Sequence, residues 1–363
     1  MKKQISNLQV AFMSANMVVA LALVNIPQAF ADLAMQNSWA VPVVLFVFAF
    51  IIIQLAFFGM NKLKDIQTIW DTNSWITKLI AMAFILLLAH LFIRDIRIIS
   101  SFVMSTLLPL TPRFVISILI IAAVLYLAWS GLEVIARFTE VIFLVFIPVI
   151  VFIPISLINE FEFSNFEPAL QLEAIPSLLQ ASFIGFAWVG EVVAILLIIH
   201  TVKPFKDAKR SVILGAGVGL FLLFVLILSS IAVIGAEVIR YNLYPTYRIV
   251  QHIRLTEFLD RLDLVLVALY FPTVFAKMAL VLYGIKRAVA LLTKKKSKFT
   301  LVPIVILLAL CANLFFRNTG ELFYFSTFTW ATLGLLLEVI IVILFMLLVR
   351  KNRKQQGVSQ QSK

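Results

Sequence analysis

The chain alternates long apolar runs with short polar connections, and ten of the runs are long enough to form membrane spans. A transmembrane helix needs about 20 predominantly apolar residues. The ten runs cover roughly residues 8–30, 41–60, 78–103, 113–131, 138–158, 175–200, 211–235, 264–285, 299–316 and 326–349. They predict an all-α integral membrane protein with one ten-helix domain, residues 1–349. We expect the polar tail, residues 350–363, to be disordered.

Two of the ten spans are interrupted in the middle, and they occupy corresponding places in the two halves of the chain. Span one is interrupted between Ala20 and Pro27, because proline lacks a backbone donor and disfavours helix just before it. Span six is interrupted between Gly185 and Glu191. Because each half holds five spans, an odd number, the second half (175–349) is inverted relative to the first (8–158). Paired broken helices in inverted repeats mark a small-molecule site near the membrane midplane.

The distribution of charge gives the orientation of the chain in the membrane. The sequence is 63% hydrophobic and 13% charged, with a mean hydropathy of +1.07, whereas soluble domains carry about a quarter charged residues. Of the 30 Lys and Arg, 21 fall at the ends of spans on the side of the N-terminus, 6 on the opposite side and 3 within spans. The positive-inside rule therefore predicts that both termini are cytoplasmic. The net charge of +12 is mainly a topology signal and does not indicate a nucleic-acid partner.

The N-terminus also has features of a cleavable signal peptide. Lys2 and Lys3 precede an apolar run that ends at Ala29-Phe30-Ala31, a small-residue pattern typical of cleavage sites. The run is longer than a usual signal core, and cleavage would leave nine spans. We therefore expect it to remain as span one.

The sequence offers no support for catalysis, a cofactor or a metal site. Cys311 is the single cysteine, so no intrachain disulfide can form. His90, His200 and His252 lie far apart in the sequence, and no nucleophile elbow, zinc-protease motif or phosphate loop is present. We expect His90 to be packed and neutral rather than facing a cavity.

The interrupted spans suit a zwitterionic ligand. Backbone groups freed inside a membrane must face protein or a polar cavity. Freed N–H groups favour a carboxylate, and freed carbonyls favour an ammonium group or a cation. Asn16 and Asn25 add polar side chains in span one, and Phe186 or Trp188 can cover a ligand or simply pack in the core. An amino acid fits best, while sugars and nucleosides remain alternatives.

Charged residues inside spans are rare and need partners. We expect Glu191 of span six to contact Lys277 of span eight. Three roles remain open for this pair: a structural ion pair, a proton-coupling group, or a charge that binds ligand or replaces a cation. Span three carries Arg94, Asp95 and Arg97, which we expect to form a paired structural cluster towards the external side.

The longest external segment, residues 236–263, has apolar residues spaced by three and four. This spacing predicts an amphipathic helix over the external mouth. Such a helix either rests on the bundle or acts as a ligand-access lid.

Short motifs distributed over the ten spans resemble those of the B subunit of spore nutrient-germinant receptors. These proteins are also called spore germination permeases and belong to the amino acid–polyamine–organocation superfamily. The motifs, in order, are Ala15-Asn16 with Pro27; Thr111-Pro112; Gly131-Leu132-Glu133-Val134-Ile135-Ala136-Arg137; Asn165-Phe166-Glu167-Pro168; Gly190-Glu191; Tyr244-Pro245-Thr246; and Lys277 with Tyr283-Gly284.

The resemblance implies a five-plus-five inverted repeat of the amino-acid-permease (LeuT-like) type and a sensing function. The implied protein is a multi-pass subunit of the bacterial spore inner membrane that binds a small germinant and signals to A-type and C-type (lipoprotein) subunits. The alternative is a proton- or sodium-coupled amino-acid permease that uses Glu191 or Lys277 for coupling. The implied ligand site comprises Ala20, Ala22, Val24, Asn25, Phe186, Trp188, Gly190, Glu191, Thr273 and Lys277. Relatives often have Gly-x-Gly where this chain has Ala20-Leu21-Ala22, which leaves less room for a ligand to approach the backbone.

Overall fold

The computed structural model describes residues 4–63, 65–70, 74–168, 170–251, 262–294 and 301–361, and its regular elements are helices. The α-helices are α1 (Asn7–Val19), α2 (Ala22–Ala34), α3 (Val41–Ala56), α4 (Trp75–Thr106), α5 (Arg113–Ser130), α6 (Leu132–Ser156), α7 (Ile175–Gly190), α8 (Ala208–Arg240), α9 (Pro245–Val250), α10 (Leu262–Thr293), α11 (Leu301–Leu314), α12 (Thr319–Tyr324) and α13 (Trp330–Gln361).

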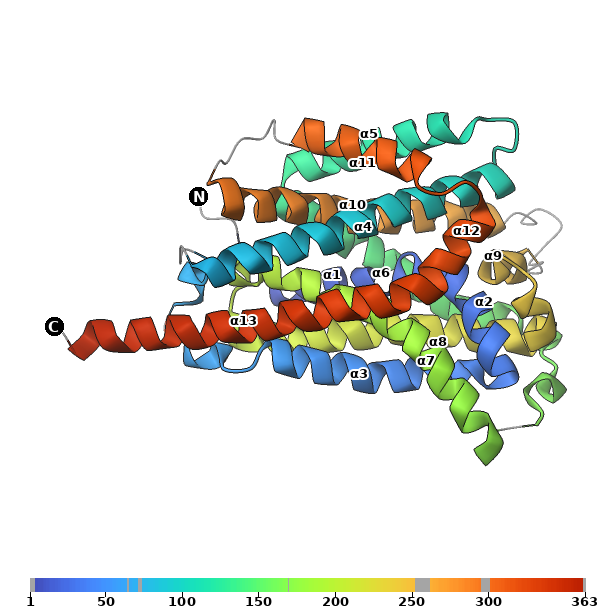
Figure 1. Cartoon of the computed structure of the whole chain (residues 1–363). Helices are drawn as coiled ribbons and strands as arrows, with labels where there is room; N and C mark the ends of the chain where they lie inside the picture. The colour runs from blue at the N-terminus through green and yellow to red at the C-terminus, as the bar shows by residue number, and fades with distance from the viewer. Residues whose placement is uncertain are drawn as a thin grey trace.

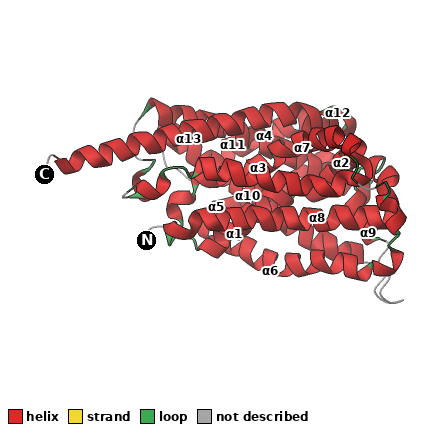
Figure 2. Cartoon of the chain, turned by 90° about the horizontal axis from the view of Figure 1, so that it is seen from below, coloured by secondary structure: helices red, strands yellow, loops and turns green. Residues whose placement is uncertain are grey.

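The helices match the ten predicted spans. Span one comprises α1 and α2, span six comprises α7 and the 3₁₀ segment Glu191–Leu197, and span ten comprises α12 and α13. Within the described residues, 8 helical stretches are long and apolar enough to cross a membrane, and α11 is a shorter apolar helix of 14 residues. Most helices run along a common direction, and both chain ends lie at the same end of the bundle (Figures 1 and 2). An even number of crossings produces this arrangement.

Corresponding spans of the two halves pack against each other. The pairs α2 with α7, α3 with α8, α4 with α10, and α5 with α11 are all in contact. Spans one, two, six and seven form one group, and spans three, four, eight and nine form another. The helices α6 and α13, which are spans five and ten, contact members of both groups. These contacts are those expected of two inverted five-helix repeats.

The interruption of span one is shallow. The backbone of Ala20 and Leu21 keeps right-handed helical angles between α1 and α2. Pro27 lies inside α2 and cannot donate to the carbonyl of Leu23. The Thr246 hydroxyl donates to that carbonyl instead, at 2.6 Å. The motif residue Thr246 therefore pairs the backbone group that the motif proline leaves free.

The interruption of span six changes the type of helix. The α-helical half ends at Gly190, and the following segment Glu191–Leu197 is a fully buried 3₁₀ helix. Runs of 3₁₀ helix this long are uncommon and often mark a functional hinge. The break falls at the Gly190-Glu191 motif, as the sequence predicts.

Two glycines with positive φ form the sharp bends of the fold. Gly131 (φ 98°) is the one-residue connection between α5 and α6. Gly235 (φ 73°) kinks α8 and leaves the Ala232 carbonyl without its helical donor. The Asn165 side chain and the Glu162 backbone N–H donate to that carbonyl, at 3.2 and 2.9 Å. The kink is therefore held by the loop that carries the Asn165-Phe166-Glu167-Pro168 motif.

Two expectations about the polar segments have different outcomes. The tail is not disordered up to Gln361, because α13 continues through it. Lys, Arg and Gln are good helix formers, so a helix started in the apolar part extends at little cost. The segment 236–263 begins with the end of α8 and continues into α9, but most of the predicted amphipathic helix, residues 252–261, lies outside the described residues.

Candidate functional site

The break in span six carries a buried network of four charged side chains. The Arg94 Nη2 group of α4 donates to Glu191 Oε1 at 2.7 Å, and Lys277 Nζ of α10 lies 2.6 Å from Glu191 Oε2. Arg94 also donates to Asp95 Oδ1, through Nη2 at 2.7 Å and Nε at 3.0 Å. Lys277 lies 3.4 Å from Asp95 Oδ2. The predicted contact between Glu191 and Lys277 is thus formed, within a larger network than the sequence indicated.

The formal charges of the network sum to zero, and its side chains are buried from solvent. Its two cations balance its two carboxylates, and the exposure of every member is 0–1%. Charges buried this deeply persist only when they are paired and hydrogen-bonded. The network joins spans three, six and eight, so a movement of any one span relative to the others must rearrange it.

Aromatic rings enclose the network. The guanidinium carbon of Arg94 lies 3.9 Å from the centre of the Trp188 ring and 5.5 Å from that of Trp330. A cation over an indole face is stabilised by the ring quadrupole. His90 stacks on Trp330 with ring centres 3.9 Å apart, so it packs against α13, in keeping with the expected packed histidine.

The expected single cluster of Arg94, Asp95 and Arg97 is wrong in one respect. Arg94 contacts both Asp95 and Glu191, whereas the buried Arg97 side chain has no hydrogen bond among the described residues. Arg97 instead lies within the electrostatic reach of Arg113 and Glu321. Asp95 and Arg97 are two residues apart on α4, so their side chains do not face each other.

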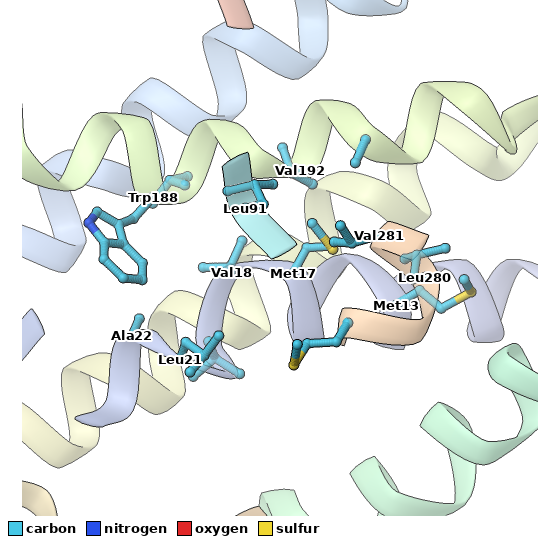
Figure 3. Close-up of a cluster of buried hydrophobic side chains, with 14 of the residues drawn as sticks. Met13, Met17, Val18, Leu21, Ala22, Leu91, Trp188, Val192, Leu280 and Val281 are labelled. Carbon is cyan, nitrogen blue, oxygen red and sulfur yellow. The ribbon is translucent and has the colours of Figure 1, made fainter. Parts of the chain in front are cut away.

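Apolar side chains fill the space between the two broken spans. Met17, Val18 and Leu21 on one side meet Trp188 and Val192 on the other (Figure 3). The predicted site residues Ala20 and Ala22 are 0% and 2% exposed within this packing. The break in span one is shallow, and packed side chains cover it. In this conformation, the backbone N–H and carbonyl groups of the described residues at the break are therefore not open to a ligand.

Two small cavities lie on the side of this packing away from the termini, and Tyr244 lines both. The first, with a volume of about 20 Å³, is lined by Leu23, Phe102, Tyr244, Thr246, Tyr247, Leu266, Val267 and Tyr270. The second, with about 10 Å³, is lined by Asn25, Ile98, Ser101, Leu243, Tyr244, Thr319, Leu322 and Phe323. Each volume suffices for about one water, so a nutrient can enter only if the lining moves.

The first cavity and the network lie along the same two helices. Phe102 follows Asp95 by seven residues on α4, and Tyr270 precedes Lys277 by seven residues on α10. At a rise of 1.5 Å per residue, both separations are about 10 Å. The first cavity is therefore about two helical turns from the network, towards the end of the bundle opposite the termini. A much larger apolar groove lies elsewhere, between α3 and α8.

Contacts close the bundle on both sides of this region. At the end that carries the termini, the Ile5 backbone N–H donates to Thr201, and Lys203 N–H donates to Ile5. At the other end, Gln28 Nε2 donates to the Arg240 carbonyl at 2.7 Å. We call the arrangement that these contacts hold the occluded form.

The remaining predicted site residues have different surroundings. Phe186 stacks on Phe48 of α3 with ring centres 4.4 Å apart, away from the cavities. The Thr273 carbonyl accepts from Asn16 Nδ2 at 3.0 Å, which links span one to span eight. Asn25 lines the second cavity, and its side-chain oxygen has no hydrogen-bond partner among the described residues. The side chain of Val24 lies outside the described part of the structure.

Apart from Asn25, sequence reasoning missed the residues that line the cavities. Tyr244 and Thr246 belong to a motif, but nothing in the sequence placed that motif over span one. Phe102 makes edge contacts with Tyr244, Tyr247 and Tyr270 at 5.1–5.8 Å, which builds an aromatic wall. Glu338 of α13 was also missed, although a lone carboxyl in an apolar span is itself a signal.

No metal centre emerges from these residues. Within the described ranges, no group of three His, Cys, Asp or Glu side chains is placed to hold an ion. The carboxylates of the network already face Arg94 and Lys277.

Comparisons with known proteins identify relatives in sequence and in fold. The family model described as "Spore germination protein" matches residues 4–320. The "Putative spore germination protein YfkT" of Bacillus subtilis (strain 168) is 28% identical over 330 residues, which are 87% of this chain and 88% of the relative. "Spore germination protein KB" of the same organism is 25% identical and covers 62% of this chain and 60% of its own length.

Two solved transporter structures share the fold. MhsT in complex with L-phenylalanine superposes with a TM-score of 0.62 over 96% of each chain, at 12% identity. Mhp1, a nucleobase-cation-symport-1 family transporter with bromovinylhydantoin bound, gives a TM-score of 0.60 over 94% of this chain and 78% of Mhp1, at 13% identity. The LeuT-like fold is thereby established, and these family and fold relatives are membrane receptors or transporters rather than enzymes.

Proposed function

This chain belongs to the spore germination protein family, and on that premise we propose that it is the nutrient-sensing membrane subunit of a spore germinant receptor. The observation that carries the proposal is the buried network at the Gly190-Glu191 break, two turns from a small closed cavity. A sensor needs a ligand site that is coupled to a structural element with two alternative conformations. The network joins three spans, and it forms only when the spans are placed so that its four side chains meet.

The proposed ligand is a small germinant, with an amino acid as the first candidate. Hydroxyl groups of Tyr244 and Thr246, the Ser101 hydroxyl and the Asn25 amide offer neutral polar partners beside aromatic rings. The buried Lys277 and Glu191 supply one charge of each sign at the inner end of the site. MhsT was solved with an amino acid bound, which makes this ligand class the first to test.

Binding would act by opening the cavities. A nutrient between α2, α4 and α10 must displace the aromatic wall, because the present volumes hold about one water each. The resulting shift of α10 against α4 would strain the ion network and move the hinge of span six. Differential binding to the opened form then changes the balance of the two forms. We propose that A-type and lipoprotein C-type subunits receive this change, in the spore inner membrane, with both termini of this chain cytoplasmic.

The test uses spores whose only receptor contains this chain and its cognate partners. Germination is measured with single amino acids and sugars, and each hit is repeated with Glu191→Gln and with Lys277→Met. We expect a response that either change abolishes or re-tunes at normal protein levels. An unaltered response in both variants would contradict a sensing role for the network.

A second candidate is a coupled amino-acid permease, because the two fold neighbours are transporters. Vesicles containing this chain alone distinguish the two functions. Saturable uptake that is driven by a proton or sodium gradient and independent of partners would favour the permease.

A further inference from the structure

Glu338 of α13 is a buried carboxyl outside the network. Its exposure is 0%, and neither carboxyl oxygen has a hydrogen-bond or ion-pair partner among the described residues. The sequence around it is apolar, from Leu335 to Leu337 and from Val339 to Leu344. A carboxyl in such a position needs an explanation, because an isolated ionised carboxylate is very costly to bury.

The carboxyl packs directly against the break in span six. A Cβ atom added at Gly190 would overlap Oε2 and Cδ of Glu338. Glycine at this position therefore makes room for Glu338, while the next residue, Glu191, enters the ion network. One carboxyl group, that of Glu338, therefore packs against Gly190, and a second is carried by the next residue, Glu191.

The balance of charges around Glu338 determines whether its carboxyl group is protonated. Arg94 and Lys277 are already matched by Asp95 and Glu191. A charge on Glu338 would leave the sealed region one negative charge in excess, beside the like charge of Glu191. The neutral, protonated carboxyl avoids this cost, which is several kcal/mol for a buried ion.

The charged and titratable groups near Glu338 come from every element around it. Helix α4 supplies His90, Arg94 and Asp95, the 3₁₀ segment supplies Glu191, and α10 supplies Lys277. The sequences of α3 and α7 contain no charged residue. Among these groups Arg94 has a nitrogen, Nη1, without a hydrogen-bond acceptor in the described residues. His90 Nε2 is also without a partner there, but Arg94 carries the positive charge, so its Nη1 is the stronger donor for an ionised Glu338.

We propose that Glu338 is a proton-binding site that reports the separation of α13 from α7. In the occluded form its carboxyl holds a proton. When α13 and α7 separate, the carboxyl of Glu338 releases its proton to water. The resulting carboxylate attracts Arg94, and this weakens the ion pair between Arg94 and Glu191. When the helices close again, a proton returns from water. Proton binding and the hinge are then linked, and each biases the other. This inference does not depend on which nutrient the chain binds.

Infrared spectroscopy of the purified chain in lipid tests the site without any nutrient. We expect the carbonyl-stretching band of a protonated carboxyl at neutral pH, where exposed carboxyls are ionised and give no such band. The band should shift in D₂O and be absent in Glu338→Gln. It should persist in the matched control Glu237→Gln, whose carboxyl is exposed. Glu338→Asp should keep a band at an altered frequency.

Three results would overturn the inference. The first is the absence of the band in the unaltered chain, which needs no variant to fold. The second is a band that remains in Glu338→Gln and disappears in Glu191→Gln. The third is a band that never shifts in D₂O while the protein stays folded, because the group would then not exchange its proton with water.

Discussion

A double-mutant cycle on Glu191 and Lys277 measures the strength of the buried network. Lys277→Met leaves Arg94 alone against two carboxylates, a net charge of −1 at 0–1% exposure. Glu191→Gln leaves a net charge of +1. Removing one partner of a buried ion pair costs roughly 3–5 kcal/mol. The double variant is neutral again, with Arg94 still donating twice to Asp95.

We therefore expect the two single variants to lose about 3–5 kcal/mol each and the double variant to lose much less than their sum. The free energy of unfolding is measured by denaturant titration of the purified chain in mixed micelles. Cys311, the single cysteine, also permits a thiol-reactive dye as a second probe.

The exposed pair Glu237 and Arg240 is the matched control. Its atoms are 3.4 Å apart, and the side chains are 64% and 31% exposed. Exposed pairs couple by about 1 kcal/mol or less. Coupling between Glu191 and Lys277 no larger than in this control would refute the network as described.

Two further predictions concern packing and a backbone hydrogen bond. Gly215→Ala should destabilise the chain by about 1–3 kcal/mol, because its Cβ would overlap the backbone of α1, whereas Gly217→Ala, which meets only a Phe46 ring, should be neutral or stabilising. The unfolding temperatures of both variants test this prediction, and equal shifts in the two temperatures would contradict it. Thr246→Val should cost about 1–3 kcal/mol, since the Leu23 carbonyl loses its donor. The control Thr139→Val, whose hydroxyl bonds within its own helix, should cost less, and the reverse order would contradict the role of Thr246.

The spans and their breaks were predictable because each rests on local sequence. Apolar length defines a span, and Gly190 beside a charged residue defines the break in span six. The pairing of Glu191 with Lys277 was also predictable, since lone charges in apolar spans must find partners. The position of Arg94 and Asp95 at the break in span six was not predictable from the sequence, because it depends on how α4 packs relative to α7.

Other features depend on contacts between distant segments. Thr246 and Leu23 are far apart in the sequence, and only the packing of α9 over α2 brings them together. Phe186 faces α3 instead of a ligand because the rotation of α7 is set by its neighbours. Glu338 was visible as a lone carboxyl, but its position against Gly190 follows only from the packing of α13 on α7.

Binding of the active nutrient to this chain alone tests the central claim most directly. The nutrient found in the spore screen is radiolabelled and titrated against the purified chain in lipid nanodiscs. We expect saturable binding that Asn25→Leu weakens about tenfold or more, since Asn25 lines the cavity and a hydrogen bond to a charged ligand contributes about 1.5–3 kcal/mol. Phe186→Leu, which alters packing on α3, should leave binding unchanged. No saturable binding without partner subunits, or loss of binding in Phe186→Leu but not in Asn25→Leu, would contradict the proposed site.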